Sequence, residues 1–261
     1  MALTVEGRAL TEAHRKAQLA IAARAAATSK ILWRRLRVSD LDGSTPAWMA
    51  AQLALMSRSY AQSESLAESY ISEYRDAENA ADAPIVGSPY VSTAMAQSML
   101  LAGPSRVKLL IGRGESADGA HAKAFTKFSG IVRRQVMSGG RMMINETTRR
   151  DQSAIGWRRV TDGNPCTFCA MLASRGPVYA SKGTADTVGG SGLRYHGHCG
   201  CTAEIIYGDW QPSEREQLYI DEYEKAAKQA NAAGESRTQD TVLWRMRENG
   251  IFRDSPLSRN K

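Results

Sequence analysis

All four cysteines of this 261-residue chain lie between residues 166 and 201. Cys166 and Cys169 form a C-x-x-C pair, and Cys199 and Cys201 stand beside two histidines, His196 and His198. An even number of cysteines suits disulfides in an exported protein, but residues 1–6 lack the basic start and apolar run of a secretory signal. A chain of this length also buries a core without disulfides. The clustering therefore favours a metal site over disulfide bonds.

The spacing of these residues is typical of a tetrahedral zinc site. A C-x-x-C turn places two thiolates on one side of a tight loop, and a second pair of ligands must return to complete the site. Sulfur and imidazole ligands select Zn²⁺ over Mg²⁺ or Ca²⁺. The preferred ligand set is Cys166, Cys169, His196 and Cys199. Cys201 is the first alternative ligand, because Cys199 and Cys201 would share a face of an extended segment, and His198 is the second alternative.

Three other interpretations of the cluster stay open. The cysteines could be small buried apolar residues without a ligand, although clustering argues against this. One thiol could be a nucleophile activated by His196 or His198, although a nucleophile needs one thiol and the segment supplies four. A catalytic zinc needs an open position and usually histidine and carboxylate ligands, and the chain contains no H-E-x-x-H motif. A closed structural zinc site is the favoured hypothesis.

Most of the chain outside the cysteine-containing segment is predicted to be helical. Apolar residues recur at helical spacing over 8–38, and Thr45 followed by Pro46 predicts the start of a long helix over 46–80. Further helices are expected over 90–111, broken at Gly103-Pro104, over 117–137 and over 213–233. Ser138-Gly139-Gly140 predicts a turn, with a possible continuation of helix to Asp151.

From Trp157 to Gly200 the chain is rich in Gly, Pro, Ser and Cys, and 202–207 alternates like a strand. The tail from Arg237 is polar with isolated apolar residues. The expected fold class is mainly α with a small, loop-rich zinc-binding module that contains short strands (α+β). Four regions are predicted: an N-terminal helical docking region over 1–85, a central helical region over 86–150, the Cys/His module over 151–210, and a charged helix with a polar tail over 211–261.

The composition restricts the partners. No window reaches the roughly 18 apolar residues of a membrane span, so no membrane partner is expected. The formal net charge of +7 and the pI of about 9.3 favour contact with an anion, but the margin is modest for a dedicated nucleic-acid-binding protein. Basic clusters could neutralise phosphates without reading bases, or they could be solvated faces. These clusters comprise Arg34, Arg35, Arg37, Arg133, Arg134, Arg141, Arg149, Arg150, Arg158 and Arg159.

The segment around the cysteines resembles the MuF-type minor head (head morphogenesis) proteins of phages. The similarity rests on G-W-R-R-V-T-D-G-N-P-C-T-F-C over 156–169, followed by H-x-x-C-x-C from His196 to Cys201, and it covers roughly residues 145–207. In that family the later box commonly reads H-P-N-C-R-C, whereas this chain has Gly197, His198 and Gly200 at the variable positions. The helical remainder of the chain is similar to these proteins only in its general character. It resembles the form found in actinobacteriophages, which is often labelled capsid maturation protease.

The resemblance implies a protein carried in few copies inside the phage head, near the portal vertex, after assembly in the host cytoplasm. The implied partners are the portal protein, the scaffold or major capsid protein, and the backbone of packaged DNA.

Two functions follow from this resemblance. One is a structural head-morphogenesis protein with a structural zinc module. The other is a prohead protease that trims scaffold or major capsid protein, for which Ser191 in Gly189-Gly190-Ser191-Gly192 is the nearest candidate nucleophile. A zinc-containing DNA-binding module is disfavoured, because no recognition helix follows the cysteine pairs at finger spacing.

The first 80 residues carry more aromatic and methionine side chains than an isolated helical hairpin can bury. Such stripes predict a partner surface over 1–80, unless they pack against 90–137. These side chains belong to Trp33, Trp48, Met49, Met56, Tyr60, Tyr70 and Tyr74.

Overall fold

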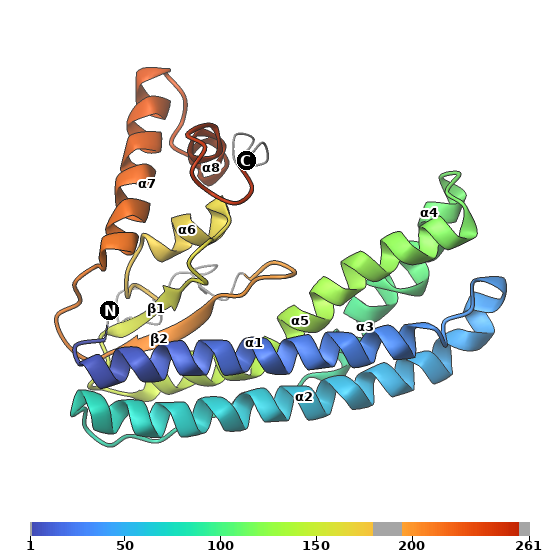
Figure 1. The fold of residues 1–261 in the computed structure, drawn as a ribbon, viewed down its shortest axis with the longest axis horizontal. Coiled ribbons are helices and arrows are strands. Elements are labelled where there is room, and N and C mark those ends of the chain that lie inside the picture. The colour runs from blue at the N-terminus through green and yellow to red at the C-terminus, as the bar shows by residue number, and fades with distance from the viewer. Residues whose placement is uncertain (1, 180–194, 256–261) are drawn as a thin grey trace.

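The computed structural model describes residues 2–179 and 195–255. Three long helices form a layer, and a small two-stranded sheet with shorter helices stands on one end of it (Figure 1). This confirms the predicted fold class. The elements are α1 (Val5–Trp33), a 3₁₀ turn (Val38–Asp40), α2 (Leu41–Glu78), α3 (Ser92–Ala102), α4 (Pro104–Gly112), α5 (Ala117–Arg150), β1 (Gly156–Val160), α6 (Thr167–Ala173), β2 (Thr202–Ile206), α7 (Glu214–Ala232) and α8 (Gln239–Glu248).

The start of α2 corrects the predicted helix boundary. Thr45 and Pro46 lie inside the helix, which begins at Leu41 because the Asp40 side chain accepts a hydrogen bond from the Gly43 N–H. An aspartate in the N-cap position satisfies one of the free N–H groups of the first turn. The Thr45 hydroxyl instead donates back to the Leu41 carbonyl at 2.6 Å. A better cap five residues upstream therefore overrode the Thr-Pro signal.

The predicted turn at 138–140 is wrong, since α5 runs unbroken through both glycines. Gly139 and Gly140 lie where α5 packs closely against α2, and the Gly140 N–H donates to Ser63 Oγ at 2.9 Å. A Cβ atom at Gly139 would lie 2.6 Å from the backbone oxygen of Tyr60. The two glycines allow a close helix contact here, which a local sequence pattern cannot distinguish from a turn.

The helical layer buries the aromatic residues of the first 80 positions. Trp33 and Trp48 pack edge to face at 5.7 Å, and Phe128 of α5 lies 5.0 and 5.2 Å from them. Tyr60, Tyr70, Tyr74 and Met56 are also buried, and Met49 packs against the same core. Trp33, Trp48 and Met56 therefore pack in a core with α3–α5, whereas Tyr70 and Tyr74 pack in a second core with the C-terminal module. The predicted exposure of these side chains, on which docking through residues 1–80 depended, is corrected.

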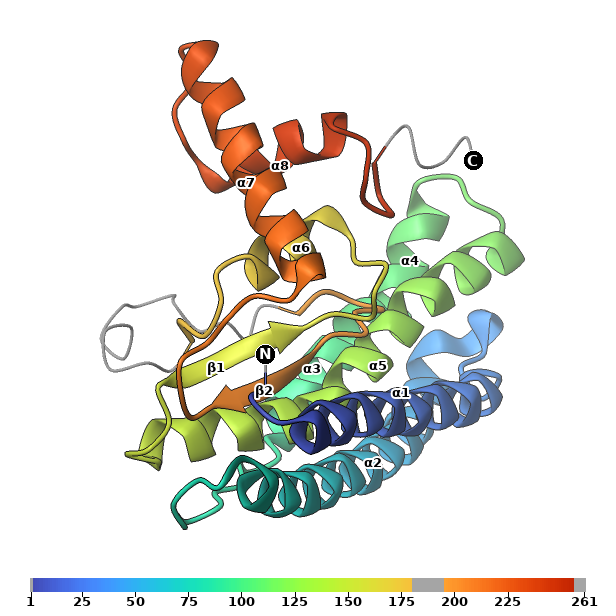
Figure 2. The same ribbon diagram turned by 60° about the vertical axis from the view of Figure 1, so that its left-hand side comes forward.

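The C-terminal part forms a module on the second half of α5 (Figure 2). Antiparallel β1 and β2 pair from Gly156 opposite Ile206 to Val160 opposite Thr202. The predicted polar tail is partly wrong, because α8 buries Val242, Leu243 and Met246, and Phe252 beyond it is 3% exposed. Isolated apolar residues in a polar tail thus formed one face of a short helix.

A buried ion-pair network inside the module is joined to α2 by a hydrogen bond. Arg158 on β1 contacts Glu204 on β2 at 2.5 Å and also pairs with Glu216 on α7, while Glu204 accepts a hydrogen bond from Tyr74 of α2. Arg158, Arg159 and Arg141 are each under 10% exposed. These three arginines are therefore removed from the predicted phosphate-binding clusters. No helix of the described residues is both long enough and apolar enough to cross a membrane.

Candidate metal centre

The two halves of the predicted site come together at the base of the module. Cys166 directly precedes α6, Cys169 lies in its first turn, and the other half arrives on the loop that leads into β2. The Nε2 atom of His196 lies 3.0 Å from the Cys166 sulfur and 3.3 Å from that of Cys169. The sulfurs of Cys169 and Cys199 are 3.5 Å apart.

These donors form two overlapping groups that share Cys169. Cys166, Cys169 and His196 make one group, and Cys169, Cys199 and Cys201 make the other, each with its ligand atoms within 4.8 Å of one another. All five predicted ligands therefore belong to one cluster, and it could hold a metal. The geometry does not separate the preferred set from one that contains Cys201.

His198, the second reserve, does not belong to either group. Its Nε2 lies 3.3 Å from the Thr126 carbonyl of α5, and its backbone has a positive φ of 63°. The ring faces Gly130, where a Cβ would lie 2.9 Å from it. His198 is thus held against α5 rather than turned toward the sulfurs.

The orientation of His196 suits a metal ligand. Its Nδ1 lies 2.6 Å from the carbonyl oxygen of Gly197, so this nitrogen carries the proton and Nε2 faces the sulfurs. A metal-ligating histidine usually donates its second N–H to such an acceptor, which fixes the ring and its tautomer. The chemistry of the donor set therefore fits Zn²⁺, for which sulfur and imidazole are preferred ligands.

Without metal, the cluster stabilises two of its four thiols, those of Cys166 and Cys199, as thiolates. The hydrogen bond from Cys169, with a further one from His196, lowers the pKa of Cys166 to about 5. The hydrogen bond to Cys166 raises the pKa of His196 to about 9. Hydrogen bonds from Cys169 and Cys201, together with the charges of Arg141 and Arg159, lower the pKa of Cys199. The other two thiols stay protonated: the hydrogen bond to Cys166 raises the pKa of Cys169, and for Cys201 the hydrogen bond from Cys169 is outweighed by the one to Cys199 and by burial, which raise its pKa. Thiolates are the form that binds metal, so Cys166 and Cys199 are ready to bind a cation, whereas Cys169 and Cys201 would release a proton on binding.

A buried arginine of α5 holds the second half of the cluster. Arg141 donates through Nε to the Cys201 carbonyl and through Nη2 to the Cys199 carbonyl, each at 3.0 Å. Its guanidinium lies 3.7 Å from the centre of the Tyr195 ring, and that of Arg159 lies 3.9 Å from the same ring. Two guanidinium groups thus enclose one aromatic ring beside the thiols and offset their negative charge.

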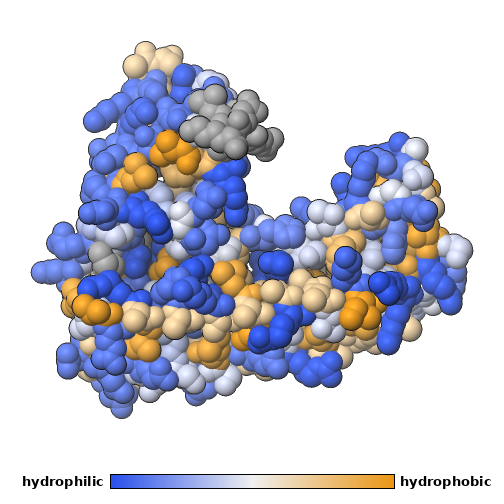
Figure 3. All heavy atoms as spheres, in the orientation of Figure 1, coloured by the Kyte–Doolittle hydropathy of each residue, from blue (hydrophilic) through white to orange (hydrophobic). Residues whose placement is uncertain are grey.

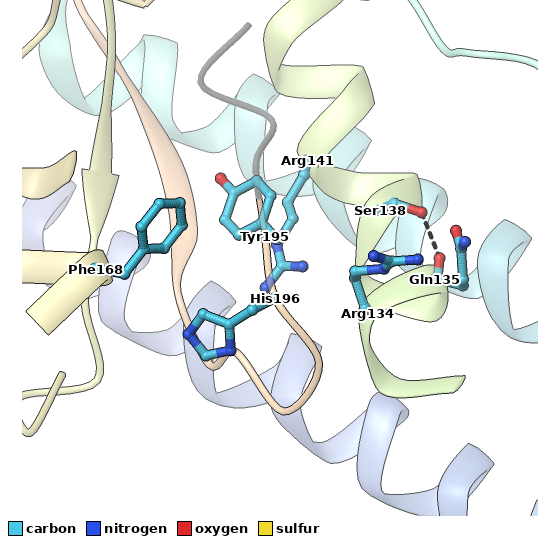
Figure 4. Close-up of a pocket in the computed structure, with 7 residues that line it drawn as sticks. All are labelled: Arg134, Gln135, Ser138, Arg141, Phe168, Tyr195 and His196. Carbon is cyan, nitrogen blue, oxygen red and sulfur yellow. Dashed lines mark hydrogen bonds between the residues drawn. The ribbon is translucent and has the colours of Figure 1, made fainter. Parts of the chain in front are cut away.

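A cavity of about 430 Å³ opens beside this arrangement, lined from α5 by Arg134, Gln135, Ser138 and Arg141. Figure 4 shows Tyr195 and His196 on its other side, with Phe168 of α6 beyond them. His196 lines this cavity, while its Nε2 lies against the sulfurs of Cys166 and Cys169.

A residue near the C-terminus holds the first half of the cluster. Asp254 Oδ1 accepts hydrogen bonds from the Thr167 N–H at 2.7 Å and from the Thr167 hydroxyl at 2.8 Å. The Arg253 N–H donates to the Pro165 carbonyl at 3.2 Å. Neither Asp254 nor this role of Arg141 was predicted from the sequence, because each side chain reaches the cluster from a distant part of the chain. The Ser191 candidate lies outside the described residues.

The comparisons with known proteins agree with a viral origin. The model of the VG15 protein family matches residues 7–230, which include the long helices, both halves of the cluster and α7 up to Ala230. The match ends before Asp254. Searches of the curated proteins and of the solved structures found no significant match. Because the family model spans most of its length, the chain belongs to the VG15 family of phage proteins.

Proposed function

We propose that this protein is a structural head-morphogenesis protein, a minor capsid protein in which one zinc ion closes the C-terminal module. The observation that carries the proposal is the convergence of three cysteines and His196 around Cys169, in two groups that contain no carboxylate. Thiolate-rich tetrahedral sites without an open position are structural rather than catalytic. The zinc would join the start of α6 to the segment before β2, which lie about 30 residues apart in the sequence.

The proposed location is the interior of the head at the portal vertex. Membership of a phage family and the MuF-like segment around the cysteines support this location. The proposed partners are the portal protein and the scaffold or major capsid protein. Contact with the DNA backbone is proposed for the exposed arginines at the end of α1 and the end of α5, which are Arg34, Arg35, Arg37, Arg149 and Arg150.

One observation favours a second function, a capsid maturation protease. Cys166 and His196 form a close thiol–imidazole pair, with the pKa of the thiol lowered to about 5 and that of the imidazole raised to about 9. This is the arrangement of a cysteine nucleophile and its base. The same imidazole nitrogen is, however, 3.3 Å from Cys169, and Cys166 is 7% exposed, which suits a shared metal better than a substrate.

Co-expression with the portal, scaffold and major capsid proteins tests the two functions together. We expect about one Zn²⁺ per chain, since four soft ligands fill one tetrahedral site. We also expect incorporation of the chain into procapsids and unchanged masses of scaffold and capsid protein. Zinc well below half an equivalent with reduced thiols would contradict the structural role.

Cleavage of scaffold or capsid protein would favour the protease if the Cys166→Ser variant abolished it without unfolding the chain. The Ser191→Ala variant tests the candidate serine nucleophile in the same way. Deletion of residues 1–80 is not a suitable test, because α1 and α2 form the core with α5.

A further inference from the structure

A second groove on the helical layer contains none of the Cys/His donors and belongs to no function assigned above, although Arg134 lines both this groove and the cavity beside His196. It is a cavity of about 430 Å³ between α3, α4 and the first half of α5. Its apolar lining, called the floor below, consists of Leu101, Leu109 and Ile131. Its basic lining, called the rim below, consists of Arg106, Lys127 and Arg134. In Figure 3 the arm that carries α4 projects away from the C-terminal module, and its surface has both hydrophobic and hydrophilic side chains.

The apolar floor is unusually exposed. Leu101 is 71% exposed and Leu109 is 43% exposed, and Leu100 and Ile111 beside them are 40% and 38% exposed. No other stretch of that length in the described residues carries as many exposed large apolar side chains. Contiguous exposed apolar residues with a polar rim usually mark a surface that a partner covers.

The charge around the groove is positive. Residues 83–114 contain no Asp or Glu. Two acidic residues outside this range form ion pairs with lysines that do not line the groove: Asp42 pairs with Lys108, and Glu115 pairs with Lys123. Within the described part of the chain, Nε of Arg106 is buried without a hydrogen-bond partner. The rim therefore offers positive charge to an anionic partner.

We propose that this groove binds an acidic amphipathic helix of a protein partner. Leucines at helical spacing on such a helix would cover Leu101 and Leu109, and flanking carboxylates would pair with Arg106, Lys127 and Arg134. DNA would satisfy the rim but leave the apolar floor exposed, since phosphates gain nothing from contact with leucine. A symmetric second copy would place this basic rim against an identical one, which costs free energy.

The proposal is tested on the full chain with a fluorescent synthetic peptide of about 18 residues, long enough to form a stable helix when bound. Leucines at i, i+3, i+4 and i+7 make one face of the peptide, and glutamates flank it. Comparison probes are a peptide of the same composition with scrambled order, a peptide with lysine in place of glutamate, and a short DNA duplex. Fluorescence anisotropy reports the affinity of each probe.

We expect the acidic amphipathic peptide to bind at least about tenfold more tightly than the scrambled and lysine peptides, a difference of about 1.4 kcal/mol. Leu101→Asp and Lys127→Glu should each weaken it about tenfold. Both positions are on the surface, so the variants should keep the wild-type helical circular dichroism. The matched controls are Leu218→Asp and Lys228→Glu on α7, which are exposed and outside the groove and should leave binding unchanged.

Four results would overturn the proposal. The first is equal binding of the ordered and scrambled peptides. The second is unchanged binding to the Leu101→Asp and Lys127→Glu variants. The third is displacement of the fluorescent peptide by the DNA duplex at a lower concentration than by the same peptide without its label, which would make the groove a phosphate-binding face. Self-association of the wild type that Leu101→Asp abolishes would instead identify the occupant as a second copy.

Discussion

Asp254 and Thr167 connect the C-terminal end of the described chain to the Cys/His cluster. One carboxylate oxygen of Asp254 accepts both the backbone N–H and the hydroxyl of Thr167, at 2.7 and 2.8 Å. Thr167 follows Cys166 directly, so this contact fixes the turn that presents Cys166 and Cys169. Arg141 does the same for the other half through the carbonyls of Cys199 and Cys201. Each half of the cluster is thus held by one distant charged side chain.

Replacing Asp254 should weaken metal binding without removing a ligand. We expect Asp254→Ala to lower the zinc affinity by about 10–100-fold, the usual effect of losing a residue that orients ligands. Asp254→Asn keeps an acceptor oxygen and should lose less. Competition with a fluorescent chelator measures the affinity. The control is Asp240→Ala, an exposed acid in the first turn of α8, and an equal loss in that variant would contradict the prediction.

Arg141→Lys should also weaken zinc binding, because one ammonium group cannot reach the two carbonyls that the guanidinium joins. We expect a loss of about tenfold or more together with a changed fluorescence of the chain, since Tyr195 loses one of its two guanidinium neighbours. Arg133→Lys, on the same helix but half-buried, is the control. Wild-type affinity in the Arg141→Lys variant would show that the carbonyl contacts are dispensable.

The cysteine variants should rank by their place in the two groups. Cys169→Ser should abolish zinc binding, because Cys169 belongs to both groups. Cys166→Ser should do the same, since no spare thiol lies near the Cys166–Cys169 pair in the sequence. Cys199→Ser and Cys201→Ser should differ, because four positions cannot take five donors. Complete zinc loss from both, measured by metal analysis, would mean that both coordinate and that His196 does not.

The close contact of α5 with α2 should tolerate no added methyl group. We expect Gly139→Ala to lower the free energy of unfolding by about 1–3 kcal/mol, because the new Cβ meets the backbone oxygen of Tyr60, which cannot move aside easily. Gly112→Ala is the matched control, since a Cβ there meets nothing within 4 Å and should raise stability by at most about 1 kcal/mol. Urea unfolding followed by circular dichroism measures both, and similar values would contradict the close packing.

His14 should make the fold sensitive to acid. Burial lowers the pKa of His14 to about 3, where its ring stacks on Tyr70 at 4.2 Å. Because the unfolded chain binds the proton from about pH 6.5 and the folded chain does not, stability falls between pH 6.5 and about 3, by about 1.4 kcal/mol per pH unit. His14→Gln should remove this slope, and His121→Gln should keep it. Parallel stability curves of wild type and His14→Gln between pH 7 and 5 would refute the assignment.

The local sequence determined the helices and the composition of the cluster. Apolar residues at helical spacing predicted the long helices, because this periodicity follows from the geometry of the backbone alone. The spacing of Cys166 and Cys169, and of His196 and Cys199, likewise identified five donors, since short-range spacing decides which side chains can face one point. The identity of the metal, the four ligands and the partners stay predictions.

The tertiary structure decided whatever depends on contacts between distant segments. Gly139-Gly140 was predicted to form a turn, but it lies inside α5 where this helix packs closely against α2. The reason for the two glycines becomes visible only when Ser63 of α2 lies next to them. The tryptophans of the first helices read as a partner surface and are core, since Phe128 and its neighbours cover them. Arg141 and Asp254 reach the cysteines from far along the chain. Such pairings are set by the packing of the whole fold, which no local pattern records.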